Sequence, residues 1–439
     1  MASYQETVRF LFRLGNEVKS ARMGLGRLEL LLDRLGRPEV AFRSVHIAGT
    51  NGKGSTAAMI EAGLRAAGYR TGLYTSPHLV HITERIQVNG GEIAPQQFCA
   101  VFQRVSAAVE QLLAEGQLEL HPTYFECLTA MAFCHFQEAG VEIAVLEVGL
   151  GGRLDATNVV RPEVAVITAI DFDHEAFLGN RAEWIAAEKA GILKRGVAAV
   201  FARQGPRAAR ALEARARELG ILPVRAGEDW RAEDVHSCEG CYRFVAAGRQ
   251  GRGIRAELSL AGEHQVGNAL AAIATLDLLG VDAGAIECGL RKTRWPGRLE
   301  RVGQGPLVLL DGAHNPAGAR ALAQYLRQHQ AGRRIWLLYA ALRDKAVEEV
   351  AGILFPCAHR VLLPALAQSR ALTPRALKAL VAHHHHNIEE GDSLAQSLAL
   401  ARARAAPADI IVVTGSLFLV GEAKEITADV EHRASPVVD

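Results

Sequence analysis

The sequence predicts an α/β protein of two domains, each built on a mostly parallel sheet. Its 439 residues exceed the roughly 250–300 at which a single core stops growing. Short apolar runs alternate with segments of helical periodicity, a pattern typical of doubly wound sheets. A glycine-rich run also stands between an expected strand and an expected helix, the position that phosphate-binding loops occupy.

The first domain begins with leucines at helical spacing and continues as alternating strands and helices. Its short apolar runs suit the strands of a buried parallel sheet. The predicted helices cover residues 25–35, 56–67, 95–114, 123–139, 181–194 and 206–219, and the predicted strands cover 45–48, 71–74, 142–147, 163–170, 197–201 and 222–225.

Residues 229–260 contain several short β-like runs with glycine turns, which we expect to form an antiparallel edge. The segment 295–300 (WPGRLE) joins a stiff proline to a flexible glycine, so we place the domain boundary there. This divides the chain into domains 1–296 and 297–439. Further helices are predicted at 266–279 and 283–292, and second-domain strands at 307–310, 334–339, 360–363 and 409–413.

The composition excludes several kinds of partner. Apolar residues make up 49% and charged residues 22% of the chain, and the formal net charge is +1. That balance gives no electrostatic reason to expect nucleic acid or a membrane surface as a partner. The seven cysteines favour a reducing compartment over a disulfide framework, and no stretch reaches the roughly 18 apolar residues of a membrane span. We therefore expect a cytoplasmic protein. We also expect a monomer, although nothing in the composition bears on the oligomeric state.

Two clusters look like parts of metal sites without completing one. Cys238 and Cys241 form a C-x-x-C pair with His236 nearby, but no second pair supplies the remaining zinc ligands. Four consecutive histidines occupy positions 383–386. Because neighbouring side chains rarely converge on one ion, we expect a solvated helix end or loop there, with adventitious nickel affinity at most.

The run GTNGKGS at residues 49–55 has the features of a phosphate-binding loop. Its glycines allow close approach of the backbone to a polyphosphate, the following helix presents N–H groups, and Lys53 adds a compact positive charge. Ser55 is placed to bind Mg²⁺. The spacing departs from the common pattern, because Ile47 replaces its first glycine and Gly54 separates Lys53 from Ser55. The alternative is a glycine-rich surface turn without function.

Polar residues follow four of the predicted strands and should meet at the carboxyl edge of the sheet. They are the loop 49–55, residues 75–78 (TSPH), Glu147 and residues 171–174 (DFDH). Oxygen ligands suit Mg²⁺, so Glu147, Ser55 and Ser76 form a plausible partial shell. The alternative for Glu147 is a cap on a neighbouring helix.

Two residues stay undecided from composition and spacing alone. His174 lies among acidic residues and is either a structural hydrogen-bonding group or a metal ligand. Lys189 follows this strand on a predicted helix. A lysine is usually solvated, although in a confined site its pKa falls and it reacts as an amine.

Ten motifs in order carry a resemblance that covers nearly the whole chain, from about residue 23 to about residue 419. They are GTNGKGS, TSPHL, TYFE, LEVGLGGRLDATN, DFDH, EKAGI, HQVGNALAA, WPGRLE, DGAHNP and TGSLF. The chain resembles the folylpolyglutamate synthase and dihydrofolate synthase family, relatives of the Mur peptide ligases. The resemblance implies a phosphate-loop, Mur-ligase-like ATPase domain followed by a smaller Rossmann-like α/β domain that carries the glutamate-ligase part.

The activity implied by the resemblance is ATP-dependent amide-bond formation. The γ-phosphate of ATP passes to a folate or pteroate carboxylate, and the amine of L-glutamate attacks the acyl phosphate. Matching the family's motifs assigns ATP contacts to Thr50, Asn51, Gly52, Lys53, Gly54, Ser55, Asn268, Arg298 and Asp311. It assigns two Mg²⁺ sites to Ser55, Ser76, Glu147, His174 and Lys189, the last as a lysine carbamylated by CO₂. Lys53, Lys189, His174 and His314 are the expected catalytic residues.

The substrate contacts implied by the family are spread over both domains. His314 and Ser416 fall where the family holds glutamate, and Lys345 is a weaker candidate. Phe125 offers a flat ring an aromatic face, although such a residue often belongs to a core, and Ile82 stands where some relatives have an aromatic residue. The segments matched to the pteroate pocket are Arg22, Met23, Gly24 and Leu25; Thr123, Tyr124, Phe125 and Glu126; and Leu154, Asp155 and Ala156.

Three alternatives remain open. Within the family, the enzyme either elongates tetrahydrofolate polyglutamates only or also adds the first glutamate to 7,8-dihydropteroate; the TYFE and LDATN segments favour the bifunctional form. A Mur-type peptide ligase needs an additional N-terminal domain, and only about 44 residues precede the first strand, below the usual size of a domain. A nucleotide-switch or motor ATPase would hydrolyse ATP without glutamate.

Overall fold

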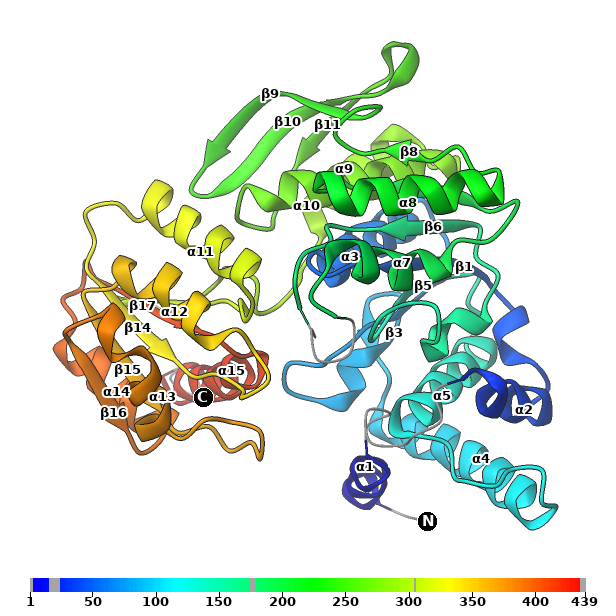
Figure 1. Cartoon of the computed structure of the whole chain (residues 1–439), viewed down its shortest axis with the longest axis horizontal. Coiled ribbons are helices and arrows are strands. Elements are labelled where there is room, and N and C mark those ends of the chain that lie inside the picture. The colour runs from blue at the N-terminus through cyan, green and yellow to red at the C-terminus, as the bar shows by residue number, and fades with distance from the viewer. Residues whose placement is uncertain (1–2, 16–23, 174–178, 304, 435–439) are drawn as a thin grey trace, which may run out of the picture.

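The computed structural model describes residues 3–15, 24–173, 179–303 and 305–434. Figure 1 shows two lobes, with the N-terminal part of the chain (blue to green) at the right and the C-terminal part (yellow to red) at the left. Each lobe contains its own largely parallel sheet flanked by helices, so the predicted fold class is confirmed. The boundary predicted between residues 296 and 297 stays a prediction.

The N-terminal lobe is centred on an eight-stranded sheet in the order β4-β3-β2-β5-β1-β6-β7-β8. The six strands β2, β5, β1, β6, β7 and β8 run parallel to one another, while β3 and β4 form an antiparallel hairpin at one edge of the sheet. The bounds are β1 Arg43–Ala48, β2 Thr71–Tyr74, β3 Ile86–Val88, β4 Gly91–Glu92, β5 Ile143–Glu147, β6 Val164–Ile167, β7 Ala198–Phe201 and β8 Val224–Arg225.

Helices cover both faces of this sheet, because alternate residues of each buried strand point to opposite sides. Val45 and Ile47 of β1 join the core formed with α3, α9 and α10. Helices α4 and α5 pack with α1 and α2 in a second core, and α7 and α8 cover β6 and β7. The bounds are α1 Tyr4–Arg13, α2 Gly26–Arg34, α3 Lys53–Ala66, α4 Pro95–Ala114, α5 Tyr124–Glu138, α7 Ala182–Lys189, α8 Pro206–Leu219, α9 His264–Leu278 and α10 Ala283–Lys292.

The direction of α3 is fixed by two close helix contacts. A Cβ atom at Gly289 of α10 would lie 2.5 Å from the Cα atom of Gly63, so the two helices touch at these glycines. A Cβ atom at Gly63 would lie 2.4 Å from Cδ1 of Leu276 in α9. Because the first turn of α3 follows the glycine-rich loop directly, this packing also holds that loop in place.

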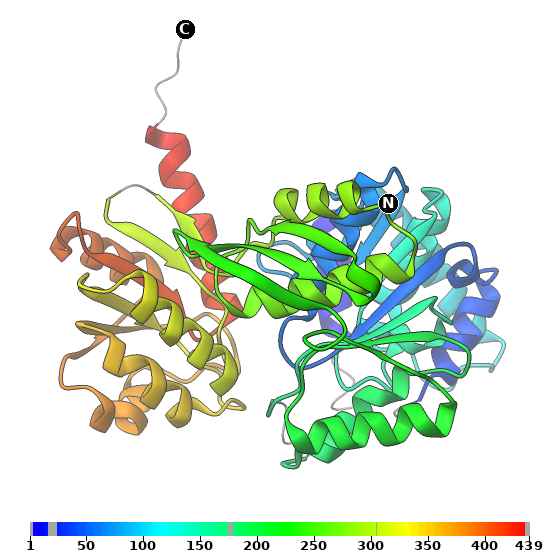
Figure 2. The same ribbon diagram turned by 90° about the horizontal axis from the view of Figure 1, so that it is seen from above.

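The segment 229–260 differs from the expectation of an antiparallel edge. It forms a separate three-stranded antiparallel sheet, β9 (Arg231–Cys238), β10 (Cys241–Ala247) and β11 (Gly253–Glu257). Its buried residues Tyr242, Phe244 and Ala246 pack into the same core as α9 and α10, so the segment covers helices and does not extend the main sheet. In Figure 2 these green strands reach from the N-terminal lobe toward the C-terminal lobe.

The C-terminal lobe has a six-stranded sheet in the order β12-β13-β17-β14-β15-β16, parallel except for β12. Helices α11, α12 and α13 cover one face, and α14 and α15 cover the other. The bounds are β12 Glu300–Val302, β13 Leu307–Leu310, β14 Ile335–Tyr339, β15 Arg360–Pro364, β16 Ile388–Gly391, β17 Ile410–Thr414, α11 Pro316–His329, α12 Val347–Leu354, α13 Pro374–Val381, α14 Leu394–Arg404 and α15 Leu417–Ala434.

None of the helices within the described residues has the length and apolarity needed to cross a membrane. The strand pairing also tests how the sequence motifs come together. Ile47 of β1 pairs with Glu147 of β5, and Ala48 pairs with Ile167 of β6. The carboxyl ends of these neighbouring parallel strands therefore meet at one edge, as the sequence predicted.

Candidate functional site

The glycine-rich loop 49–55 connects β1 to α3 and is held tightly on both sides. Gly52 has φ 85°, and a Cβ atom there would lie 2.2 Å from Oδ1 of Asn268. A Cβ atom at Gly49 would lie 1.8 Å from Oγ1 of Thr168. Glycine is therefore required at both positions by backbone conformation or close approach. The loop ends at the N-terminus of α3, where unpaired N–H groups attract an anion.

Lys53 and Glu147 place opposite charges beside this loop. The Nζ atom of Lys53 donates to the carbonyl of Thr50 at 3.2 Å and lies 3.9 Å from Oε1 of Glu147. Glu147 is the last residue of β5, and its carboxylate accepts the N–H of Ser76 at 3.2 Å. Burial raises the pKa of Glu147, while Lys53 acts in the opposite direction. A buried carboxylate of this kind is costly unless a cation accompanies it.

Two hydroxyl-bearing residues belong to the same edge. Ser55 is buried, and its Oγ accepts a hydrogen bond from Nε2 of Gln265 at 3.3 Å. Gln265 in turn accepts from Nδ2 of Asn268 at 2.9 Å, so α9 orients this side of the loop. Ser55 and Ser76 line one cavity together with the Glu147 carboxylate. Oxygen donors of this type are those that Mg²⁺ prefers.

Lys189 ends α7 and is turned into the protein. Its side chain is buried, and Nζ donates to the carbonyl of Gly49 at 2.8 Å. The neighbouring loop fits closely, since a Cβ atom at Gly152 would lie 3.0 Å from the Cα atom of Lys189. Burial, with a contribution from the charge of Lys53, lowers the pKa of Lys189 to about 7. The amine is therefore readily neutral, and a neutral amine is a nucleophile.

The C-terminal lobe faces these groups with the loop after β13. The Asp311 carboxylate accepts the N–H groups of Leu299 and Ala313, both at 3.0 Å, and burial raises its pKa. His314 lies three residues further along, and its Nδ1 is 2.8 Å from the carbonyl of Gly312. Backbone donors thus hold Asp311 rigidly at the edge of the second sheet.

Asp173 lies in the DFDH motif and joins the two lobes, although no individual role was predicted for it. Its Oδ1 pairs with Nζ of Lys345 at 2.6 Å, and its Oδ2 lies 3.4 Å from Nε2 of His314 and 3.4 Å from Nδ2 of Asn315. Asn315 also donates to Oδ1 of Asn51 in the glycine-rich loop at 3.0 Å. Lys345, a weaker candidate from the sequence, is therefore brought to this junction.

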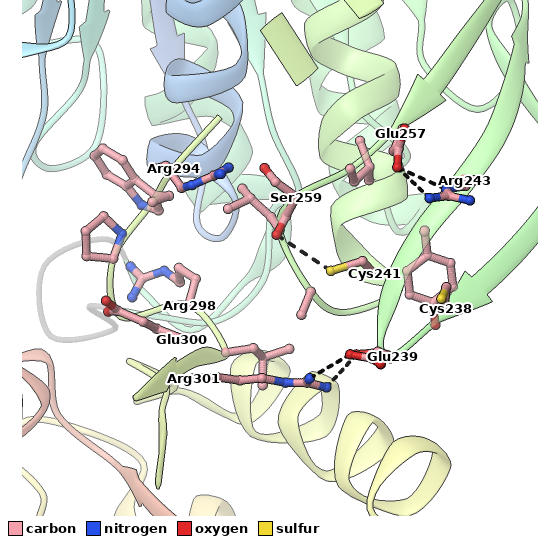
Figure 3. A pocket seen from close by; sticks show the side chains of 17 residues that line it. Cys238, Glu239, Cys241, Arg243, Glu257, Ser259, Arg294, Arg298, Glu300 and Arg301 are labelled. Carbon is pink, nitrogen blue, oxygen red and sulfur yellow. Dashed lines mark hydrogen bonds and ion pairs between the residues drawn. The ribbon is translucent and has the colours of Figure 1, made fainter. Parts of the chain in front are cut away.

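Among the cavities near the junction of the lobes, two are distinguished by their chemistry. The larger, of about 410 Å³, is bordered by the β9–β10 turn and residues 294–301 (Figure 3), and contains no residue of the glycine-rich loop. Cys238 and Cys241 border it as free thiols, and Arg301 pairs with Glu239 at 3.3 Å. The second cavity, of about 340 Å³, contains the loop 49–55, Glu147, Lys189 and the facing residues of the C-terminal lobe. We take the second as the candidate site because the phosphate-binding and acidic groups gather there.

Comparison with known proteins gives the family. Residues 47–276 match the Mur ligase middle domain, and residues 297–417 match the Mur ligase glutamate ligase domain. The dihydrofolate synthase/folylpolyglutamate synthase of Bacillus subtilis is 37% identical over 415 residues, covering 92% of this chain and 94% of that protein. The chain belongs to the folylpolyglutamate synthase and dihydrofolate synthase family. It is thus a ligase whose two domains match the Mur ligase family, as the motifs predicted.

Solved structures agree in fold over nearly the full length. The folylpolyglutamate synthase of Mycobacterium tuberculosis complexed with ADP superimposes with a TM-score of 0.91 at 34% identity, covering 97% of this chain and 98% of that one. Escherichia coli FolC in complex with DHPP and ADP gives a TM-score of 0.86 at 32% identity, covering 99% and 100%.

The 340 Å³ cavity is lined by all the described residues that the family motifs assign to ATP and Mg²⁺, together with His314. Those residues are Thr50, Asn51, Gly52, Lys53, Gly54, Ser55, Ser76, Glu147, Lys189, Asn268, Arg298, Asp311 and His314. They come from both lobes, so the cavity is formed only when the lobes face each other. Their individual roles stay predictions.

Several residues matched to the pteroate pocket have internal partners in the structure. Thr123 caps α5, with its Oγ1 accepting the N–H of Glu126 at 3.3 Å, and the Glu126 carboxylate accepts the N–H of Thr123 at 2.7 Å and pairs with Arg27 at 3.2 Å. The buried Asp155 carboxylate accepts the N–H groups of Gly149 at 2.9 Å and Leu150 at 3.0 Å. These groups shape the surrounding loops.

Aromatic rings gather beside these loops. Tyr124 stacks on Phe12 with ring centroids 5.6 Å apart, and the guanidinium of Arg85 lies 5.5 Å from the Tyr124 ring centroid. Phe125 packs closely against Gly149 in the loop after β5, since a Cβ atom at Gly149 would lie 2.7 Å from its ring. Flat rings and one cation therefore lie beside the segment 123–126, which the family motifs match to the pteroate pocket.

The remaining predicted residues have varied positions. Ser416 is buried, and its Oγ has no hydrogen-bond partner among the described residues; its neighbour Leu417 lines the candidate cavity. Gly24 is exposed just before α2, and Leu25 caps that helix. Leu154 is half-buried in the loop after β5, and Ala156 is buried at the start of the 3-10 helix Ala156–Val159. Ile82 is buried at the start of the 3-10 helix Ile82–Arg85, which precedes β3. Arg22, Met23 and His174 lie outside the described residues.

Proposed function

We propose that this chain is an ATP-dependent ligase that adds L-glutamate to tetrahydrofolate polyglutamates and to 7,8-dihydropteroate. One observation carries the proposal. A single cavity places the phosphate loop, Glu147 and Lys189 opposite Asp311 and His314 of the other lobe. A ligase that uses ATP must hold the phosphates, the acceptor carboxylate and the incoming amine together, and a cavity between two lobes provides that arrangement.

The nucleotide half of the proposal rests on the glycine-rich loop. Its two constrained glycines allow close approach of the backbone, the first N–H groups of α3 have no acceptor within the helix, and Lys53 supplies positive charge within reach of the loop. The relatives solved with ADP support ATP as the nucleotide here. We also assign Asn268, Arg298 and Asp311 to ATP, because these three residues line the same cavity from α9, the linker and the second lobe.

The residues present fit Mg²⁺. Glu147 is a buried carboxylate that lines the same cavity as Ser55 and Ser76, and the carboxylate and hydroxyl groups of these residues offer oxygen donors. We assign one ion to these three residues, together with His174. The neutral amine of Lys189 would react with CO₂ to give a carbamate, which adds an oxygen ligand for a second ion. When bound, Mg²⁺ neutralises charge on the transferring phosphoryl group.

The chemistry consists of two displacements. A carboxylate oxygen of the folate attacks the γ-phosphorus, ADP leaves, and an acyl phosphate forms. The neutral amine of glutamate then attacks the acyl carbon, phosphate leaves, and the nitrogen loses a proton to give the amide. Lys53 and Arg298 stabilise the negative charge of the first step, and the facing lobe excludes water that would hydrolyse the acyl phosphate.

The bifunctional assignment has separate support. The Bacillus subtilis relative carries both activities in its name, and Escherichia coli FolC was solved with DHPP. Here the Phe125 ring packs against Gly149 in the loop after β5, and the guanidinium of Arg85 lies over the neighbouring Tyr124 ring. Such a surface suits a flat, partly polar pterin ring. A monofunctional folylpolyglutamate synthase is the alternative.

An ADP-release assay tests the proposal and its alternatives. Purified protein is supplied with ATP and Mg²⁺, and the folate substrate and L-glutamate are omitted in turn. We expect sustained ADP release only with both present, for 7,8-dihydropteroate as well as for tetrahydrofolate. Activity restricted to tetrahydrofolate would favour the monofunctional enzyme. Sustained release without glutamate would refute the ligase and favour a nucleotide-switch ATPase.

We also propose domain limits of 1–296 and 297–439, a monomeric state and a cytoplasmic location. The two family matches end at residue 276 and begin at residue 297, which is compatible with that boundary. The seven cysteines of the chain are free thiols, as a reducing compartment requires. Limited proteolysis at the linker and size-exclusion chromatography with light scattering would test the first two proposals.

A further inference from the structure

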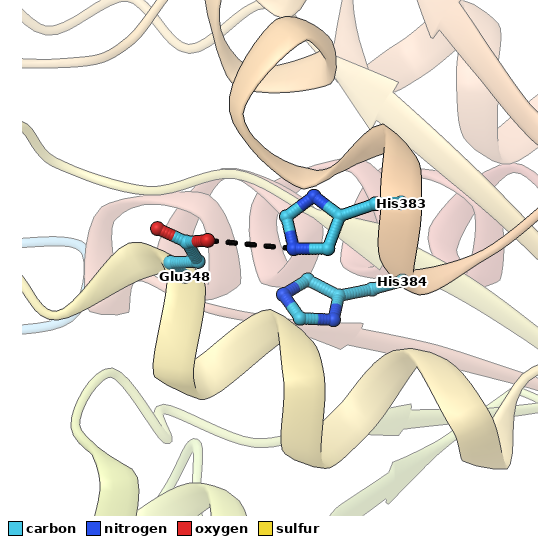
Figure 4. A group of neighbouring side chains, drawn as sticks. All are labelled: Glu348, His383 and His384. Atoms are coloured by element: carbon cyan, nitrogen blue, oxygen red, sulfur yellow. Dashed lines mark ion pairs between the residues drawn. The ribbon is translucent and has the colours of Figure 1, made fainter.

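Two of the four consecutive histidines meet an acidic residue of another helix. His383 and His384 lie in the short 3-10 helix Ala382–His384 that follows α13, and Glu348 lies in the first turn of α12. One ligand-capable atom from each of the three residues lies within 4.8 Å of the other two. Figure 4 shows both imidazole rings turned toward the Glu348 carboxylate. The sequence-based expectation of a merely solvated helix end therefore missed a convergence that only tertiary structure creates.

His384 is held against α12 with a free ring nitrogen. Gly352 stands one turn after Glu348 on the same face of the helix, and a Cβ atom there would lie 3.1 Å from Cε1 of His384. The absence of a side chain thus makes room for the imidazole. Its Nε2 is enclosed and has no hydrogen-bond partner among the described residues. An enclosed polar atom without a partner costs free energy, so the arrangement favours a ligand at this nitrogen.

His383 completes the group from the solvent side. Its Nε2 lies 3.4 Å from Oε1 of Glu348, and its ring centroid lies 3.9 Å from that of His384. An ion pair between His383 and Glu348 alone would leave the His384 nitrogen unpaired. A cation bound between the three side chains would satisfy all of them.

The other two histidines of the run do not share this geometry. The ring nitrogens of His385 lie 3.2 Å from the carbonyl of Asn387 and 3.1 Å from that of Ala358. His386 stacks on His385, with ring centroids 4.9 Å apart. The run is therefore divided, with one pair facing α12 and the other pair placed elsewhere.

We propose that Glu348, His383 and His384 bind a divalent transition-metal ion, with Zn²⁺ the best chemical fit. Two imidazoles and one carboxylate form a common zinc donor set, and the exposure of Glu348 and His383 leaves a fourth position for water. Around a tetrahedral zinc ion, ligand atoms lie about 3.3 Å apart. The three ligand atoms here lie within 4.8 Å of one another, so side-chain rotations would bring them to that separation. The ion would link α12 to the 3-10 helix that follows α13. Glu348, His383 and His384 do not line the ligase cavity, so this site is separate from it.

The test uses the full chain without an affinity tag, freed of metal with a chelator and kept in excess Mg²⁺ to occupy oxygen-ligand sites. Co²⁺ binding is followed by its visible absorption and Zn²⁺ binding by calorimetry. We expect one ion per chain, and an affinity at least about tenfold weaker in His384→Ala and in Glu348→Gln. His386→Ala removes one histidine from the same run and should stay within about twofold of the parent chain.

Thermal unfolding of each metal-free variant shows whether the fold is kept, and added Zn²⁺ should raise the unfolding temperature of the parent and of His386→Ala only. Equal weakening by His386→Ala and His384→Ala would mean that the run binds metal as a flexible chelator, which overturns the proposal. Unchanged affinity in all three variants, or no binding up to about 1 mM Zn²⁺, would overturn it as well.

Discussion

The two faces of the ligase cavity are built differently. On the N-terminal face, the polar groups are held by their own lobe: Lys189 donates to Gly49, and Glu147 accepts from Ser76. On the C-terminal face, Asp311 is held internally, but His314 and Lys345 meet their partner Asp173 only across the gap. The nucleotide face is therefore preformed, and the face proposed to hold glutamate depends on closure of the lobes. Variants on the N-terminal face should therefore change the use of ATP, and variants on the C-terminal face should change the binding of glutamate.

The largest effect is expected at Lys53. Lys53→Ala removes the positive charge next to the loop and leaves the buried Glu147 without its nearby cation. We expect kcat/KM for ATP to fall by roughly 10²–10³-fold, the range seen when one group that stabilises transition-state charge is lost. Lys378→Ala is the control and should stay near the parent value, because its side chain on α13 is 40% exposed and does not line the cavity. A fall of less than tenfold in Lys53→Ala would contradict a preformed phosphate site.

The next effect is expected at Lys189, on the same face. Lys189→Ala should lower kcat by roughly 10²-fold through loss of a metal ligand, and Lys189→Glu should restore part of it by returning a carboxylate. Folate and ATP binding should change little, because the backbone of the loop stays in place. Wild-type-like activity in Lys189→Ala would refute a role in binding the second ion.

The pH dependence at Lys189 follows from its pKa of about 7. Only the neutral amine reacts with CO₂, so the carbamylated fraction should rise as the pH increases through about 7. An ordinary lysine, with a pKa of about 10.4, would stay protonated over this range. Carbon-13 NMR with labelled bicarbonate would show one carbamate signal, absent in Lys189→Ala. A signal that appears only near pH 10 would show that the amine is not buried as described.

A smaller effect, of a different kind, is expected for the closure contacts. The pair of Asp173 with Lys345 has side chains that are 9% and 10% exposed, whereas the pair of Asp171 with Arg320 has side chains that are 31% and 53% exposed. Buried pairs are costly to break and exposed pairs contribute little.

Asp173→Asn should raise KM for glutamate by roughly tenfold with a small change in KM for ATP. Asp171→Asn, the matched control two residues away, should change neither by more than about twofold. Equal effects of both variants on ATP and glutamate would show that the two faces do not differ.

The sequence predicted elements best where they are local. The bounds of α4, α8 and α10 match their predicted ranges, because helical periodicity and terminal residues specify them. It missed the edge strands β12 and β16, which are short and partly exposed, so they lack an apolar run. It also placed residues 229–260 at the sheet edge, because strand patterns do not say which surface the strands cover.

In the candidate site, too, residues in local motifs were predicted and residues defined by distant contacts were not. Lys53, Glu147 and Lys189 stand in motifs, and the motifs predicted them before any contact was known. Asp173 and Gln265 lie within the DFDH and HQVGNALAA motifs but were not selected, because a motif does not show which residues its side chains contact. Their partners are more than a hundred residues away in the chain. The same reason explains why His384 could not be paired with Glu348 from the sequence.

The smallest effect concerns a residue for which the family motif and the structure give different roles. The motif places Thr123 in the pteroate pocket, while the structure makes it the N-cap of α5, with the Glu126 N–H 3.3 Å from its Oγ1. If capping is its role, Thr123→Ala should lower the free energy of unfolding by about 1 kcal/mol and leave KM for dihydropteroate within about twofold. Urea unfolding followed by circular dichroism, together with steady-state kinetics, measures both quantities.

Thr373 offers a matched control, because it caps α13 with the same 3.3 Å distance to the Ala376 N–H, far along the chain from the proposed pocket. Thr373 is exposed and Thr123 is buried, so Thr373→Ala should cost less stability, since solvent replaces its lost hydrogen bond more easily. A tenfold rise in KM for dihydropteroate with unchanged stability in Thr123→Ala would instead make Thr123 a substrate contact. In that case the pocket reaches the start of α5, and the preformed face extends from the nucleotide to the pterin.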